Sequence, residues 1–207
     1  MKPYAKFKWL IALLLIGVNA KPLFAQSKSD LTDPKVPITW LGVDYSQTKF
    51  IGSPSQFKEL GSISNEEFRY KYTDAWNMLF VNEQKKYDVA KALHRGSINY
   101  AIDVSQKTNN ALKKDFFSNN PGDFKKLTEQ DISNVVKNYD FQNNSGIGLI
   151  FFVEGMSKGM ESMGIWVTYV DMKSKTVIQT TYKTAKPGGI GFKNYWAKPL
   201  YTILKEM

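Results

Sequence analysis

Apolar and polar positions follow their most regular pattern in the C-terminal third of the chain, between Gly146 and Lys205. A nearly continuous apolar run at 147–153 predicts a strand that is covered on both faces. Residues 165–171 and 176–184 alternate between apolar and polar and are joined by a short polar turn. This pattern predicts a three-strand meander whose last strand lies nearer the edge of the sheet.

Three segments show the periodicity of amphipathic helices. Residues 64–80 and 128–139 each begin at a residue that favours helix N-caps and then carry one apolar stripe. Residues 192–205 predict a closing helix. Pro199 lies inside this helix and lacks a backbone donor, which predicts a kink or a start nearer Lys198.

The segments between these elements predict the rest of one domain. Residues 38–45 predict a strand, and residues 56–60 a single helical turn. Residues 87–93 and 98–104 predict two further strands with a turn between them. The expected fold is therefore α+β, with one mixed, mainly antiparallel sheet of about five strands and helices packed on it, over residues 38–207.

The first 25 residues have the pattern of a secretory signal peptide. Three lysines precede an apolar run at 9–18, which is too short for a membrane span of about 20 residues. Small residues follow, and cleavage is expected after Ala25, with Ala20 as the alternative and an uncleaved anchor as the rival interpretation. Residues 26–37 are polar, contain two prolines and predict a flexible arm.

The charge and the cysteine content limit the classes of partner and the compartment that are expected for the protein. The formal net charge of +9 falls to +5 without residues 1–25, which contain four lysines and no acid. Arg69 and Arg95 are the only arginines, so the pattern does not favour nucleic acid. Because the chain has no cysteine, it forms no disulfide and carries no lipid-anchor Cys. We expect a soluble periplasmic or secreted protein with no integral span after cleavage.

Catalytic and metal motifs are weak. There is no nucleophile elbow, and the single histidine, His94, lies in an expected turn. The sequence has neither a His/Cys cluster nor a calcium loop, so we expect no metal and no cofactor. Glu154 follows an apolar strand, and a carboxylate site with Asp44 or Asp103 requires that their strands run parallel to its own.

A Gly-rich corner connects the last strand to the last helix. It contains Gly188, Gly189 and Gly191, flanked by Lys186 and Lys193. A strand, glycines and a helix start in this order can hold an anion or small ligand on free backbone N–H groups. Turn geometry explains the same glycines, and we expect Gly191→Val to damage folding before any activity.

The order of elements, with a meander whose second strand ends at Asp171, resembles small exported α/β accessory domains. These are the periplasmic domains of the curli-secretion lipoprotein family and of the penicillin-binding-protein activator lipoprotein family. The chain departs from both because it lacks their lipid-anchor Cys. The resemblance implies an accessory or assembly module rather than an enzyme.

The sequence therefore favours a non-catalytic module that binds a protein or an envelope component. Two alternatives remain. One is an enzyme that acts on envelope glycans or esters through a strand-end acid, and the other is a small-ligand or anion binder at the Gly-rich corner. A concave pocket with convergent polar groups is expected for the enzyme, and a flat aromatic patch or an unpaired sheet edge for the binding module.

Overall fold

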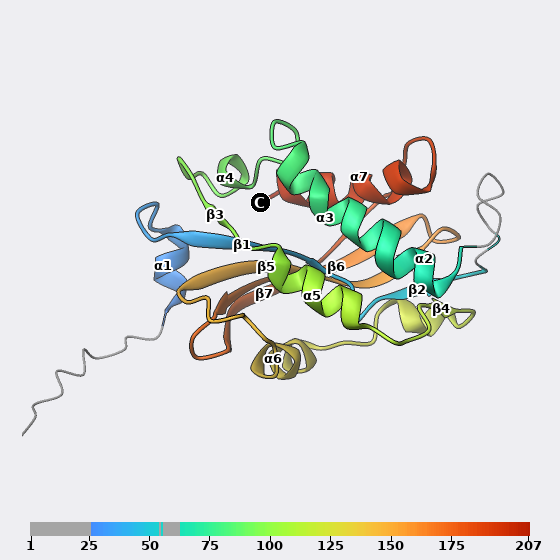
Figure 1. Ribbon diagram of the computed structural model, residues 1–207, viewed down its shortest axis with the longest axis horizontal. Coiled ribbons are helices and arrows are strands. Elements are labelled where there is room, and N and C mark those ends of the chain that lie inside the picture. The colour runs from blue at the N-terminus through green and yellow to red at the C-terminus, as the bar shows by residue number, and fades with distance from the viewer. Residues whose placement is uncertain (1–25, 54, 56–62) are drawn as a thin grey trace, which may run out of the picture.

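The computed structural model describes residues 26–53, 55 and 63–207 (Figure 1). The expected signal peptide and the helical turn expected at 56–60 lie outside these residues. The strands are β1 (Ile38–Asp44), β2 (Lys49–Ile51), β3 (Asn99–Tyr100), β4 (Phe117–Ser118), β5 (Ile147–Ser157), β6 (Ser162–Asp171) and β7 (Thr176–Ala185). The helical elements are α1 (Lys28–Thr32), α2 (Asn65–Glu67), the π-helix η3 (Phe68–Tyr72), α3 (Thr73–Asn82), α4 (Val89–Ala92), α5 (Asp103–Ala111), the 3-10 helix η4 (Pro121–Phe124), α6 (Glu129–Lys137) and α7 (Phe192–Lys205).

The fold is α+β, but the expectation of a mainly antiparallel sheet is wrong. Five strands, in the order β3-β1-β5-β2-β4, pair in parallel. β1 and β2 follow each other along one side of β5 and pair with its first and second halves. Helices precede β3, β4 and β5, and each helical crossover returns the chain to the same end of the sheet. The antiparallel part is limited to β5, β6 and β7.

Two of the expected strands do not form as predicted: residues 87–93 are mainly helical, and residues 98–104 keep only a short strand. Residues 87–93 contain α4, which Asp88 caps by accepting a hydrogen bond from the Lys91 N–H at 2.9 Å. Residues 98–104 contain only the two-residue β3 before α5 begins at Asp103. A local alternation of apolar residues therefore occurs here without a long strand, because tertiary contacts outweigh a short sequence pattern.

The sheet buries apolar side chains on both faces. Trp40 on β1 packs in a cluster with Trp76 of α3 and Trp196 of α7. The next residue, Leu41, points to the other face, where Ile132 of α6 belongs to a second cluster. Figure 1 shows the corresponding layers, with α3, α4 and α7 on one side of the strands and α6 on the other. A fully buried apolar side chain in such a cluster contributes roughly 2 kcal/mol to stability.

The closing helix begins at Phe192, and Pro199 lies within it rather than near its start. At the other end of the chain, the segment expected to be a flexible arm contains α1 and contacts the domain. The Arg95 guanidinium donates hydrogen bonds to the carbonyl oxygens of Leu31, Asp33 and Val36 at 2.6–3.1 Å. These bonds hold the loop after α1 against the helical layer.

Candidate functional site

The carboxylate of Asp44 is buried at the end of β1, beneath α6. It accepts hydrogen bonds from the Ser46 N–H at 2.7 Å and from the Tyr139 hydroxyl at 2.5 Å. Burial raises the pKa of Asp44 above its ordinary value. Nearby, the Lys114 ammonium donates to the Ser46 carbonyl at 2.7 Å, and burial together with Lys49 lowers the pKa of Lys114 to about 8.

Glu154 is another buried acid, and its carboxylate accepts hydrogen bonds from three groups of the protein. One carboxylate oxygen accepts hydrogen bonds from the backbone N–H groups of Lys126 and Leu127. The other accepts from the Trp166 indole N–H at 2.8 Å. Glu154 is 2% exposed, so these donors take the place of water. The carboxylate therefore fastens the segment before α6 to the sheet.

The parallel pairing of β1 with β5 does bring two of the three expected acids to one face. Asp44 is in register with Phe152, which contacts Tyr139 of the α6 layer, and Glu154 bonds the segment that leads into α6. Asp103 does not join them, because it is an exposed residue at the start of α5. Each of the two buried carboxylates is enclosed by its own donors, and the contacts give both a structural role.

Two asparagines complete the outer edge of β1, where a bulge follows the short pairing with β3. The Asn77 side chain accepts from the Val43 N–H at 2.7 Å and donates to its carbonyl at 2.8 Å. Asn109 accepts from the Tyr45 N–H at 2.8 Å. Gly42 is needed beside them, because its φ is +94° and a Cβ there would lie 2.5 Å from the Asn77 amide oxygen. These buried side chains thus satisfy backbone N–H and C=O groups that no neighbouring strand of the described chain pairs with.

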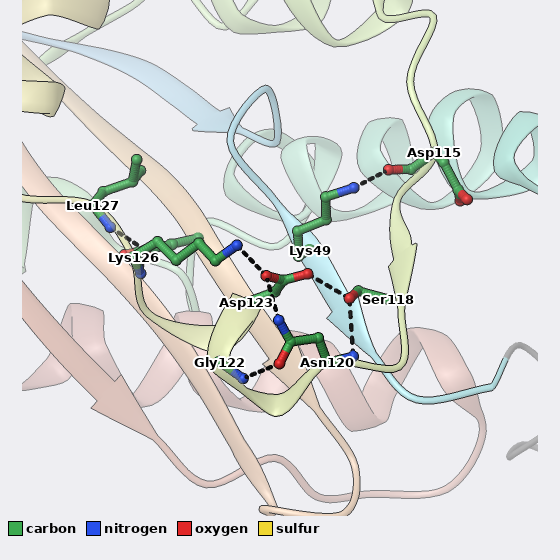
Figure 2. Close-up of polar contacts among 9 residues, drawn as sticks. Lys49, Asp115, Ser118, Asn120, Gly122, Asp123, Lys126 and Leu127 are labelled. Carbon is green, nitrogen blue, oxygen red and sulfur yellow. Dashed lines mark hydrogen bonds and ion pairs between the residues drawn. The ribbon is translucent and has the colours of Figure 1, made fainter.

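A polar cluster closes the loop between β4 and α6. Figure 2 shows Asp123 at its centre, where the carboxylate accepts from the Ser118 hydroxyl and the Asn120 amide and pairs with Lys126. Lys126, and then Ser118, lower the pKa of Asp123. Beside the cluster, the Lys49 ammonium donates to the Asp115 carbonyl at 2.7 Å. The bonds of Asp123 join residues three to five positions apart, so this cluster stabilises the loop itself.

The Gly-rich corner has the sharp backbone that the sequence predicts, with positive φ at Gly189 and Gly191. A hollow of about 360 Å³ lies beside it, and Gly191 and Lys193 are among its lining residues. Lys186 instead forms an ion pair with Glu161 at 2.6 Å, and the Gly188 N–H donates to a carbonyl of α7. The corner therefore brings together only part of the expected ligand set. Gly191 has φ 78° and ψ 153°, a region essentially limited to glycine, which supports the prediction that Gly191→Val damages folding.

A lysine-rimmed cavity of about 380 Å³ lies between α4 and the C-terminal end of α7. The lysines that line it are all exposed at the surface, and they are Lys85, Lys86, Lys91 and Lys205. His94 lines it too, from the turn after α4. Among the described residues that line it, Asp88 is the one acidic side chain, and it already caps α4. No ion pair joins any of the four lysines to an acid within the described ranges.

The floor of this cavity is partly apolar. Tyr201 and Leu204 of α7 line it together with Ala92 of α4. The ammonium groups of Lys86 and Lys205 each lie 5.6 Å from the centre of the Tyr201 ring, on which such cations are stabilised. The cavity therefore combines an aromatic surface with lysines that form no ion pair among the described residues.

The charge of the chain is concentrated in the same helical layer. Residues 65–95 and 186–207 contain ten Lys and Arg against six Asp and Glu, whereas residues 96–185 contain ten against nine. Sequence reasoning missed this cavity, because its lysines come from separate segments that meet only when α4 packs beside α7. The available signal was the Lys85–Lys86 pair followed by Lys91, which shows a local excess of positive charge.

The described residues show neither a metal-binding cluster nor a membrane-spanning helix. Among them, no group of three or more His, Cys, Asp or Glu is placed to hold a metal ion. Within the same ranges, no helix is both long enough and apolar enough to cross a membrane.

Comparisons with known proteins do not identify the chain. It matches no protein-family model, and neither a curated protein nor a solved structure is significantly similar to it. The resemblance to the two lipoprotein families therefore stays a prediction.

Proposed function

We propose that the protein is an exported, non-catalytic binding module that holds an anionic group of a cell-envelope component in the lysine-rimmed cavity. The observation that carries this proposal is a concave site lined by four lysines that have no acidic partner within the described part of the chain. Export follows from the expected signal peptide at residues 1–25. The non-catalytic part is supported by the two buried acids of the expected carboxylate site, because Asp44 and Glu154 are enclosed by protein donors.

The residue types in the rim suggest the chemistry of the ligand. Lysine ammonium groups act as mobile point charges, without the planar fork by which arginine selects one bidentate geometry. They fit phosphate or carboxylate groups in several orientations. The apolar floor of Tyr201 and Leu204 can cover a neighbouring apolar part of the same ligand. An envelope component with phosphate or carboxylate groups on an otherwise less polar body matches both features.

The test uses two soluble anions, inorganic pyrophosphate and citrate, with the full chain. We expect each to raise the melting temperature saturably, beyond the effect of sodium chloride at equal ionic strength, because a ligand that binds only the folded state stabilises it. Isothermal titration calorimetry with the same anions measures the affinity directly. A preference for pyrophosphate or for citrate then separates phosphate from carboxylate ligands.

A charge-matched pair of variants locates the binding. Lys86→Glu combined with Lys91→Glu reverses two charges on the rim, whereas Lys173→Glu combined with Lys175→Glu reverses two exposed charges in the turn between β6 and β7. We expect the first variant to lose anion binding and the second to keep it. Equal loss in both would show a general charge effect and would overturn the proposal, as would the absence of saturable binding in the unaltered protein.

A further inference from the structure

The tip of the Gly-rich corner presents an apolar side chain directly to solvent. Ile190 is 88% exposed, the highest value among the large apolar residues of the described chain. It lies between Gly189 and Gly191, whose positive φ values turn the backbone on either side of it. Exposure of this extent gives the isoleucine no role in the core, so the packing of this protein does not explain it.

A second apolar residue lies at the same end of the molecule. Met160, in the turn between β5 and β6, is 53% exposed. The neighbouring Glu161 forms its 2.6 Å ion pair with Lys186, which ties this turn to the loop between β7 and α7. Figure 1 shows both loops at one end of the molecule, away from α1. The ion pair thus joins two loops that each expose an apolar side chain.

Unpaired positive charge lies next to this apolar tip. Lys193 and Lys198 are exposed on the first two turns of α7, and neither has an ion-pair partner within the described residues. The stem of Lys198 passes over Gly188, where a Cβ would lie 3.1 Å from its Cδ. Lys71 lines the same hollow as Ile190, although Glu67 neutralises it at 2.8 Å. The tip is therefore apolar at its end and basic around its base.

We propose that this end of the protein docks on an anionic lipid bilayer, with Ile190 and Met160 inserted at the interface and Lys193 and Lys198 against lipid headgroups. Apolar side chains that project from a basic surface combine the two attractions that hold peripheral proteins on anionic membranes. A bilayer suits a protruding tip, because it receives an apolar group without a preformed pocket. None of the residues that line the lysine-rimmed cavity takes part in this docking.

The absence of cysteine from the sequence permits a site-specific test. Ile190→Cys in the full chain is labelled with the environment-sensitive fluorophore NBD, and Val81→Cys, at an exposed apolar position on α3, serves as the matched control. Vesicles contain phosphatidylcholine alone or with about one-third phosphatidylglycerol, a share chosen to give the strong negative surface that attracts basic segments. We expect the emission at position 190 to shift to the blue and brighten on the anionic vesicles, and the emission at position 81 to stay unchanged.

Vesicle flotation measures the energetic contribution of the tip. We expect Ile190→Asp to weaken partitioning onto anionic vesicles about tenfold or more, because a charge replaces a group that is inserted at the interface. Lys193→Glu combined with Lys198→Glu is expected to weaken it similarly and to reduce its salt dependence. Lys173→Glu combined with Lys175→Glu is the control and should keep most of the binding. Far-UV circular dichroism verifies that each variant is folded.

The outcomes separate this inference from the cavity proposal. If Ile190→Asp partitions like the unaltered protein, or if the labels at positions 190 and 81 respond equally, the docking proposal is overturned. Lys86→Glu combined with Lys91→Glu is expected to keep the response at position 190. If this variant no longer binds soluble anions but still docks on vesicles, the two surfaces act independently. Vesicle binding that depends on the cavity lysines and not on Ile190 would overturn the docking proposal alone.

Discussion

Two charged regions of this protein are built in opposite ways. Beneath α6, Asp44 and Glu154 are nearly inaccessible to solvent, and each carboxylate is enclosed by two or three protein donors. Between α4 and α7, the cavity lysines are exposed and have no acidic partner in the described chain. A buried charge without donors costs several kcal/mol, so the first arrangement is required by folding. The second is not required by folding, and this difference makes it the better candidate for binding.

The largest expected effect comes from removing a buried acid. Glu154→Ala leaves the N–H groups of Lys126, Leu127 and Trp166 without their acceptor, which we expect to cost about 3 kcal/mol or more. Urea unfolding followed by circular dichroism measures this loss. The control is Glu161→Ala, which removes an exposed acid that is paired with Lys186, and we expect it to cost under about 1 kcal/mol. Similar losses in both variants would contradict the structural role that its three donors give Glu154.

The elements that the sequence predicted well are those with a strong local pattern. β5, β6, β7, α6 and α7 each coincide with an apolar stripe or alternation that a single segment displays. The parallel topology could not be predicted from such local patterns. It depends on the pairing of both β1 and β2 with β5, which is distant from them in the sequence.

The helix α5 illustrates a second reason why sequence patterns did not predict part of the fold. Its buried residues include Ser105 and Asn109. Asn109 is held by the hydrogen bond that its amide donates to the Val43 carbonyl of β1, at 2.9 Å, rather than by an apolar stripe. A helix that is stabilised by such tertiary contacts can have a polar sequence without an apolar stripe. Its sequence pattern then does not distinguish it from a loop. The lysine-rimmed cavity was hidden for a related reason, since its residues are 120 positions apart between Lys85 and Lys205 and meet only in the folded chain.

An intermediate effect on stability is expected from Lys114, a largely buried lysine beside Asp44. Burial lowers its pKa to about 8 in the folded protein, below the ordinary value of 10.5 for an exposed lysine. Between these two values the unfolded chain binds more protons, so stability must rise with pH in this window. We expect a gain on the order of 1 kcal/mol between pH 7.5 and pH 9.5, measured by urea unfolding.

Lys114→Met identifies the source of that pH dependence. Methionine keeps much of the length of the side chain and carries no proton to lose, so the gain in stability should disappear. Lys137→Met, at the exposed end of α6, is the control and should leave it in place. A gain that persists in Lys114→Met would show that other groups titrate in this window.

The smallest expected effect concerns the cavity, and it is the most informative for function. Lys86→Glu combined with Lys91→Glu removes no ion pair within the described chain and no hydrogen bond that holds the fold. Substitutions at exposed positions of this kind change the free energy of unfolding by about 0.5 kcal/mol or less. Loss of anion binding at unchanged stability would show that these lysines are needed for binding and not for folding. A loss of stability like that of Glu154→Ala would instead assign them a structural role, because a cation needed for packing cannot be reversed without cost.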